Sequence, residues 1–253
     1  MKRILVFVYG VMSYVISLAI FAYLAGFLGN LLVPWSIDAT PDGPLWEALV
    51  INTLLLTVFG LQHSVMARPR FKDWLTRFVP RPAERSTYMV FTNLALVLLF
   101  WQWRPTGGVI WDAQDSTSRG IIHGTYIAGW LIALGTTFLI NHFDLFGLRQ
   151  VWLYLRGKPY TSLGFKTPGP YKVVRHPLYI GWFIVFWATP TMTIAHLIFA
   201  AGMTVYILIA IPFEERDLED YHGENYAAYR RKVPMLIPIP RGDGPMKPSV
   251  EEV

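Results

Sequence analysis

The sequence predicts an all-α integral membrane protein with four transmembrane helices, followed by a helical hairpin in the membrane and a cytoplasmic C-terminal helical segment. Three observations support this prediction. Of the 253 residues, 53% are hydrophobic and only 15% are charged, whereas a soluble domain of this length needs more surface charge. Apolar runs long enough to cross a bilayer recur along the chain. The basic residues gather in short loops between these runs, which is the pattern of the positive-inside rule.

The four predicted spans cover about residues 4–37, 46–66, 88–103 and 120–140. The loop after the first span is acidic, and the loops after the second and fourth are basic, so these two basic loops should face the cytoplasm. Lys2 and Arg3 then place the N-terminus on the same side. No small-residue cleavage site follows the first run, so we expect it to be a retained span and not a signal peptide.

The last apolar run, residues 177–213, is too long for one crossing. A single helix of this length would measure about 55 Å, nearly twice the hydrocarbon core. Pro190 lies near its middle and should break it, and both flanks contain basic residues. The sequence therefore predicts a hairpin that descends to Pro190 and returns from Thr193, with the following segment packed over its mouth. We expect one membrane domain over residues 1–241 and a disordered tail over residues 242–253.

The composition excludes several classes of site. The chain has no cysteine, so it has no disulfide, no thiolate metal site and no cysteine nucleophile. No H-x-x-x-H or H-E-x-x-H spacing is present, and we expect no metal site. Gly-rich phosphate-binding loops are also missing. The net charge of +5 is explained by the cytoplasmic loops, so we expect no nucleic-acid partner.

Polar residues flank the predicted hairpin. Arg175 and His176 precede Pro177, which suits the first turn of a helix, where free backbone donors favour an anionic group. Alternatively, Arg175 extends to lipid phosphate and His176 only caps the helix. At the other flank, Glu214 and Glu215 could bind a ribose diol or an amine, or accept an arginine. Adjacent residues point in different directions on a helix, so at most one of them should face a site.

A second polar segment, NHFDLFGLRQ, follows the fourth span. The carboxylate of Asp144 is close enough in sequence to orient the imidazole of His142 and leave its other nitrogen free as a base. The alternative is an ordinary polar helix end. Arg149 and Gln150 lie in the same segment, and His63, near the end of the second span, could approach it. A lone histidine at a span end is more often structural.

The segment GPYKVVRHPLYIG, the apolar run, EERDL and NYAAYRRKVPMLIP occur in this order. This combination resembles the membrane methyltransferases of the isoprenylcysteine carboxyl methyltransferase and phospholipid methyltransferase group. The family often has Phe-Gly where this chain has His222 and Gly223, a mild departure. The four preceding spans and NHFDLFGLRQVW resemble a bacterial branch of the group that methylates methanethiol.

The resemblance implies S-adenosylmethionine (SAM) as the methyl donor, bound within about residues 141–238. The residues that it places around the cofactor are Tyr171, Arg175, His176, Tyr179 and Gly181, with Glu214 or Glu215 binding polar groups. Arg175 suits the carboxylate of the methionine moiety, and aromatic faces suit the sulfonium or the adenine.

The resemblance also implies a small volatile thiol as acceptor, so that methanethiol becomes dimethyl sulfide. We expect His142, oriented by Asp144, to remove the thiol proton, and Arg149, Gln150 and His63 to lie at the acceptor. The same chemistry on a lipid or isoprenylcysteine-type acceptor is the main alternative. A membrane transporter is a third, but it predicts ionisable residues at mid-membrane and repeat symmetry, which the sequence lacks. We expect the protein in the bacterial inner membrane, with both termini cytoplasmic and lipid as its surroundings.

Overall fold

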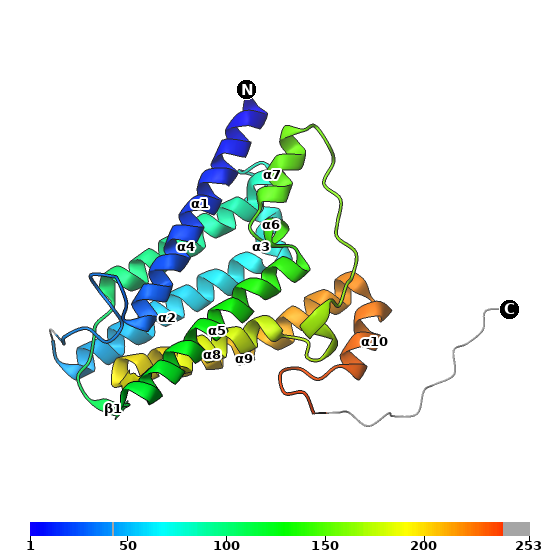
Figure 1. Ribbon diagram of the computed structural model, residues 1–253. Coiled ribbons are helices and arrows are strands. Elements are labelled where there is room, and N and C mark those ends of the chain that lie inside the picture. Colours follow the sequence, from blue (N-terminus) through cyan, green and yellow to red (C-terminus); the bar gives the residue numbers. More distant parts are fainter. Residues whose placement is uncertain (42, 240–253) are drawn as a thin grey trace.

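The computed structural model describes residues 1–41 and 43–239, and the predicted tail at 242–253 lies outside these residues. Long helices run side by side, and the loops gather at the two ends of the molecule (Figure 1). The elements, in chain order, are α1 (Lys2–Gly29), α2 (Leu45–Ala67), α3 (Pro69–Leu75), η1 (Arg81–Ala83), α4 (Glu84–Gln102), β1 (Val109–Asp112), α5 (Ser116–Ile140), α6 (His142–Leu145), α7 (Leu148–Leu155), η2 (Gly169–Lys172), α8 (Pro177–Trp187), β2 (Thr191–Thr193), α9 (Ile194–His222) and α10 (Glu224–Lys232).

Within the described residues, four helices are long and apolar enough to cross a membrane, namely α1, α2, α5 and α9. Their outward faces carry large apolar side chains that the protein itself leaves uncovered, such as Leu54, Leu131 and Ile209. Exposed apolar surface on this scale needs an apolar solvent. The chain is therefore a membrane protein whose surface contacts lipid.

The predicted third span, residues 88–103, corresponds to α4, which is not among these four helices. Helix α4 is less apolar than these four because it contains several polar residues, and packing against α1 shields some of these from lipid. Asn93 is 5% exposed and its amide donates to Ser17 Oγ of α1 at 2.9 Å. Ser13 of α1 donates to the backbone oxygen of Ser86 at 3.0 Å. Hydrogen bonds as well as apolar contacts thus fasten α4 to α1.

The long run at residues 177–213 is divided between α8 and α9, and Pro190 lies in the connection between them. The connection contains β2, which pairs antiparallel with β1 so that Thr191 faces Asp112. The sequence predicted an all-α protein, and this small sheet corrects that prediction. Strands of three and four residues are too short to give a clear alternating pattern.

The loop after α1 is fastened to the same end of the molecule. His196, at the start of α9, contacts Asp38 through Nδ1 at 2.9 Å and the backbone oxygen of Phe186 through Nε2 at 3.1 Å. Thr193 also donates to the Asp38 carboxylate. Burial alone would raise the pKa of Asp38, but the hydrogen bonds from His196, Thr193 and Asn30 outweigh it and hold this pKa below its ordinary value.

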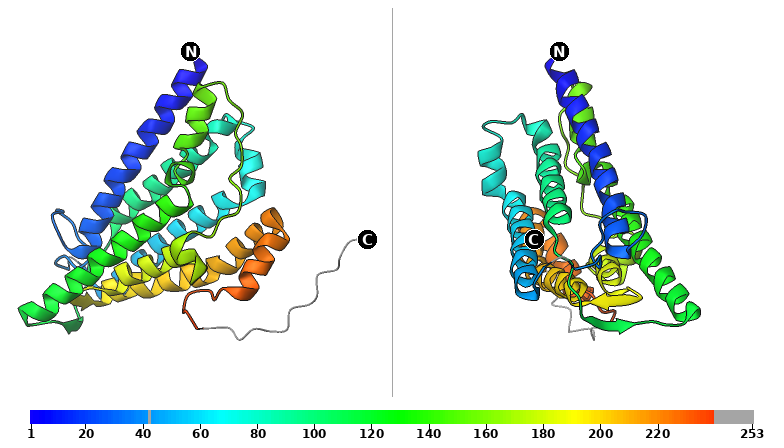
Figure 2. Two further views of the ribbon diagram at one scale, coloured as in Figure 1. Left: turned by 45° about the vertical axis from the view of Figure 1, so that its right-hand side comes forward. Right: turned by 90° about the vertical axis from the view of Figure 1, so that its left-hand side faces the viewer.

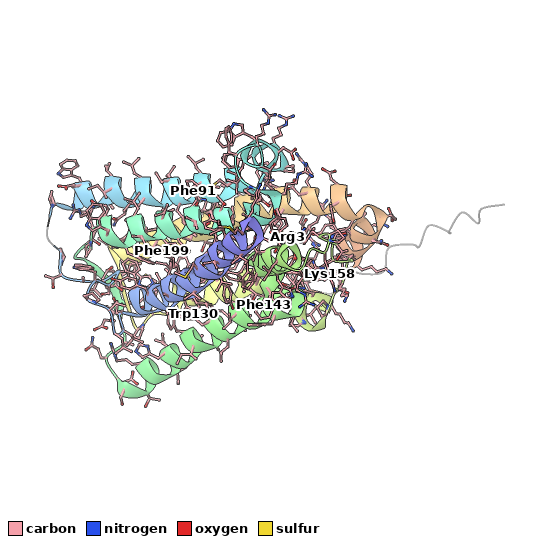
Figure 3. All side chains as sticks on the ribbon, turned by 90° about the horizontal axis from the view of Figure 1, so that it is seen from above. Arg3, Phe91, Trp130, Phe143, Lys158 and Phe199 are labelled. Atoms are coloured by element: carbon pink, nitrogen blue, oxygen red, sulfur yellow. The ribbon has the colours of Figure 1, made fainter. Side chains whose placement is uncertain are left out.

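The opposite end holds the N-terminus, α3, α6, α7 and α10 (Figures 1 and 2). Arg68, after α2, forms an ion pair with Asp217 near the end of α9 at 2.9 Å. Arg3 lies over the ring of Tyr154 in α7. Figure 3 shows Lys158 toward this end, with Trp130 and Phe199 along the helices. The loops after α2 and α5 therefore share one end, and the loops after α1 and α4 share the other.

Helices α5 and α8 approach each other closely through glycine. A Cβ atom on Gly181 would lie 2.6 Å from the backbone nitrogen of Ala133, and one on Gly129 would lie 2.8 Å from Ile184 Cγ2. Small residues permit such close helix contact in membranes. The resemblance placed Gly181 at the cofactor, but the structure gives its missing side chain a different reason, which is the packing of α8 on α5.

We expect Gly181→Ala to lower the thermal unfolding midpoint in detergent, because overpacking a tight contact costs about 1–3 kcal/mol. Gly135→Ala on α5 is the matched control, since nothing lies within 4 Å of a Cβ at that position. It should be neutral or slightly stabilising, because alanine favours a helix over glycine by up to about 1 kcal/mol. Equal midpoints for the two variants would contradict the packing role.

Candidate active site

A buried ion cluster joins the start of α8 to α9. Arg175 Nε donates to Glu215 Oε1 at 2.6 Å, and His176 Nε2 lies 2.9 Å from the same oxygen. Arg230 Nε, from α10, reaches Glu215 Oε2 at 3.1 Å. The side chains of Arg175 and Glu215 are each 4% exposed. The structure thus brings together three residues that the sequence predicted for the cofactor site.

The C-terminal segment closes over this cluster. Arg175 Nη1 donates to the backbone oxygens of Arg230 and Val233, at 3.1 and 2.5 Å. The backbone nitrogens of Arg175 and His176 donate to the oxygens of Pro234 and Met235. The chain turns back after α9 at Gly223, whose φ of 58° is a conformation that favours glycine. The entrance of α8 is therefore covered by residues that follow α10.

The two adjacent glutamates have different surroundings. Both oxygens of Glu215 accept from cationic side chains of the protein. Glu214 is half-buried, and among the described residues only Tyr179 hydrogen-bonds to its carboxylate, at 2.6 Å. Of the two, Glu214 is the carboxylate with an oxygen left for a ligand, and Glu215 holds Arg175 and His176 in place.

Aromatic side chains surround the same region. The hydroxyl of Tyr226 is buried and has no hydrogen-bond partner among the described residues. It lies within electrostatic reach of Glu214, Glu215 and Arg175. Tyr229 donates to the backbone oxygen of Tyr171 at 2.6 Å. Burial raises the pKa of Tyr229 to about 12, and burial and the charge of Glu214 raise the pKa of Tyr171. These phenols are therefore neutral hydrogen-bonding groups at physiological pH.

Phe165, in the segment between α7 and α8, packs on α10. Its ring centroid lies 5.8 Å from that of Tyr226 and 5.4 Å from that of Tyr229. This segment runs along one side of the molecule toward α9 and α10 (Figure 2). It adds an aromatic wall to the region covered by the C-terminal segment.

The predicted pairing of His142 with Asp144 is wrong. His142 Nε2 lies 2.9 Å from the Tyr14 hydroxyl, and Nδ1 lies 2.8 Å from Thr137 Oγ1. The imidazole stacks on Phe138 with centroids 4.1 Å apart. The Asn141 side chain caps α6 by accepting from the backbone nitrogen of Asp144 at 3.0 Å. The Asp144 carboxylate is engaged by residues other than His142.

The partners of Asp144 are two side chains from the same part of the chain. Arg149 donates to Oδ1 at 3.0 Å, and Tyr160 donates to Oδ2 at 3.1 Å. Arg149 also donates to the hydroxyl and backbone oxygens of Thr161, and Gln150 donates to the backbone oxygen of Asp144. Arg149 and Gln150 therefore tie α7 to α6 and to the following segment, and no contact joins them to the Glu215 cluster within the described residues.

His63 lies on α2, apart from His142. It stacks on Phe59 and contacts Tyr88, with ring centroids 5.4 and 5.1 Å away. The basic residue Arg85 lies between the two regions, within electrostatic reach of His63 and hydrogen-bonded to the backbone oxygen of Leu145 in α6. Within the described residues, no hydrogen bond or ring contact joins the two histidines directly.

Curated relatives match nearly the whole chain. The methanethiol S-methyltransferase of Crocosphaera subtropica is 55% identical over 239 residues, which are 94% of this chain and 94% of that protein. The methanethiol S-methyltransferase of Mycobacterium tuberculosis is 51% identical over 240 residues, or 95% and 98% of the two chains. This chain belongs to the methanethiol S-methyltransferase family. Nurim of Mus musculus is similar at 28% identity over 191 residues, 72% of each chain. No family model and no solved structure matches the chain.

Sequence reasoning missed several residues at the candidate site of this methanethiol S-methyltransferase family member. Tyr226, Tyr229 and Arg230 lie within the quoted C-terminal motif, but the segment by itself is more typical of an interfacial helix with an aromatic belt. Tyr88 and Tyr206 lie in apolar helices, where a single tyrosine gives no signal of its own. Tyr14 could have been suspected, because Ser13 and Ser17 flank it in an otherwise apolar run.

We expect Glu215→Gln to lower the thermal unfolding midpoint far more than Glu214→Gln. Removing the charge of Glu215 leaves Arg175 buried without a counterion, which costs about 3–5 kcal/mol, whereas a glutamine at 214 can still accept from Tyr179. Tryptophan fluorescence during heating at one scan rate measures both variants. A midpoint for Glu215→Gln equal to that of the unaltered protein would show that the cluster is not structural.

Proposed function

We propose that the chain transfers a methyl group from SAM to methanethiol and releases dimethyl sulfide. The observation that supports this proposal is the identity of 55% and 51% to proteins named methanethiol S-methyltransferase, over at least 94% of the chain. The donor is the one implied by the RHPLYIG, EERDL and NYAAYRRKVP motifs.

The groups at the entrance of α8 fit this donor. Arg175 Nη2 has no hydrogen-bond partner among the described residues, so it can bind a carboxylate. Glu214 can accept from an ammonium or from ribose hydroxyls, and Tyr226 offers a buried hydroxyl that lacks a partner. The aromatic faces of Tyr171 and Tyr179 suit a sulfonium or an adenine.

Bound there, SAM would supply an electrophilic methyl group on a sulfonium, whose thioether needs no proton as it leaves. The work left to the protein is to hold the two reactants in line, to exclude water and to take the thiol proton. The C-terminal segment, which hydrogen-bonds to Arg175 and His176, covers the site. Holding two reactants in the reacting geometry can lower a barrier by several kcal/mol.

The donor and the acceptor can be tested together in detergent. Isothermal titration should show saturable binding of SAM, and headspace gas chromatography should detect dimethyl sulfide after methanethiol is added. A protein-free sample with SAM, thiol and detergent measures the uncatalysed background. Binding without dimethyl sulfide would exclude methanethiol and direct the search to lipid or isoprenylcysteine acceptors. Absence of SAM binding by folded protein would overturn the proposed function.

We also propose how the chain lies in the membrane. It spans the bacterial inner membrane with its N-terminus, α3, α7 and α10 on the cytoplasmic side, and α8 and α9 form a hairpin whose mouth opens there. The domain ends near residue 241. Two facts support this arrangement: the loops after α2 and α5 share one end of the molecule with α10, and basic residues are concentrated in these loops.

The lack of native cysteine allows a direct test of this topology. Single cysteines replace the exposed residues Thr40, Arg70, Gln114 and Lys158, and intact bacterial cells are treated with a membrane-impermeant maleimide. We expect labelling at positions 40 and 114 only, and labelling at 70 and 158 only after the membrane is broken. The reverse pattern would invert the proposed orientation.

A further inference from the structure

His63 occupies an aromatic site on α2, next to α9. Phe59 stacks on one face of the imidazole, and Tyr88 of α4 contacts the ring. The side chain is partly accessible. Apolar walls of this kind suit a small alkylthiol better than a charged or bulky group.

The hydrogen bonds around His63 determine its tautomer. Nδ1 lies 3.4 Å from Thr92 Oγ1, and the Thr92 hydroxyl donates to the backbone oxygen of Tyr88 at 3.1 Å. With its proton directed to that backbone oxygen, the Thr92 hydroxyl oxygen is placed to accept from Nδ1–H. The lone pair of His63 is therefore on Nε2, to which none of the described residues hydrogen-bonds.

The same reasoning gives the same tautomer for His142, but there the lone pair has a partner. Thr137 Oγ1 donates to the backbone oxygen of Leu134 at 2.6 Å and so accepts from His142 Nδ1–H. The lone pair on Nε2 then accepts from the Tyr14 hydroxyl at 2.9 Å. His142 is also only 2% exposed, and burial lowers its pKa. Its basic nitrogen is occupied by the protein.

Tyrosine side chains connect the surroundings of His63 electrostatically with Glu214. Tyr206 of α9 packs directly over Gly60, where a Cβ would lie 3.0 Å from its ring, and its hydroxyl lies 3.1 Å from Ser64 Oγ. Tyr206 is within electrostatic reach of Glu214, and Tyr179, which donates to Glu214, is within reach of both Tyr206 and Tyr88. The groups around His63 are therefore within electrostatic reach of Tyr179 and Glu214.

We propose that His63, and not His142, is the base that removes the proton of the acceptor thiol, a proposal that rests on the proposed function. The S–H bond breaks and its proton moves to Nε2. The sulfur electron pair forms the new bond to the methyl carbon, while the bond from that carbon to the donor sulfonium breaks and leaves its electrons on the donor sulfur. Thr92 accepts from Nδ1–H of the resulting imidazolium. Arg85 is the charged group that reaches the ring. Its positive charge opposes the imidazolium but stabilises a thiolate beside it, so it favours ionisation of the acceptor and return of the proton from the ring to solvent. Tyr88 and Tyr206 are the nearby titratable groups.

The central test compares His63→Asn with His142→Asn. Asparagine at 63 keeps a donor toward Thr92 but has no basic nitrogen. We expect His63→Asn to lower kcat/KM for methanethiol at neutral pH by about 10²–10⁴-fold, the usual contribution of a general base, with SAM affinity by calorimetry unchanged. His142→Asn should stay within a few-fold of the unaltered protein in kcat/KM.

Acceptor thiols of different acidity distinguish a general base from a residue with only a structural role. With trifluoroethanethiol, which ionises more readily than methanethiol, and at higher pH, the deficit of His63→Asn should shrink markedly. A deficit that is the same for both thiols at every pH, or full turnover by His63→Asn, would overturn the proposal.

A chemical probe tests the histidine assignment without any turnover. Diethyl pyrocarbonate acylates accessible unprotonated imidazole nitrogens, so mass spectrometry should find His63 modified and His142 protected. The reverse labelling would overturn the tautomer argument. If the unaltered protein neither binds SAM nor methylates a thiol, both the proposed function and the role of His63 as a base are wrong. Labelling of His63 would still show in that case whether its Nε2 is free.

Discussion

The burial of the Glu215 carboxylate is the constraint that determines how α8, α9 and α10 meet at the end of the molecule proposed to face the cytoplasm. An ionised carboxylate is very costly to bury unless charged donors surround it. Arg175 and Arg230 supply the positive charge from two separate parts of the chain, and His176, next to Arg175, adds a further contact. Because separating Arg175 from Glu215 would leave two buried charges unpaired, the start of α8 and the end of α9 are held together, and Arg230 joins α10 to them.

The opposite end of α8 and α9 is held by a second polar contact of the same kind. Asp38 accepts from His196 and Thr193, while His196 also contacts the last turn of α8 through the backbone oxygen of Phe186. Between these two polar ends the contacts are apolar and close, with Gly181 against Ala133 and Gly60 against Tyr206. Such an arrangement fixes both ends of α8, and with them the aromatic side chains that line the proposed site.

Adjacent and similar residues take different roles in this framework because their surroundings differ. Glu215 is fully engaged by the protein, whereas its neighbour Glu214 has a single partner in Tyr179. Likewise, His142 and His63 are both imidazoles beside a threonine, yet Tyr14 occupies the lone pair of the first and nothing described occupies that of the second. A methyl transfer to sulfur needs a base but no acid, so one free imidazole nitrogen suffices for the acceptor half of the chemistry.

The resemblance to membrane methyltransferases predicted that Arg175, His176 and the glutamates lie together. The sequence by itself determined the membrane class, the approximate positions of α1, α2 and α5, and the break at Pro190. These features depend on composition, run length and local backbone preference, which are readable along the chain. It did not determine that α4 hides Asn93 against Ser17, that Asp144 pairs with Arg149 and not with His142, or that Gly181 serves the contact with α5. Each of these depends on which residue of a distant helix lies opposite, and only tertiary packing decides that. The choice between His63 and His142 belongs to the same class, because the free lone pair depends on partners that lie up to 128 positions away in the sequence.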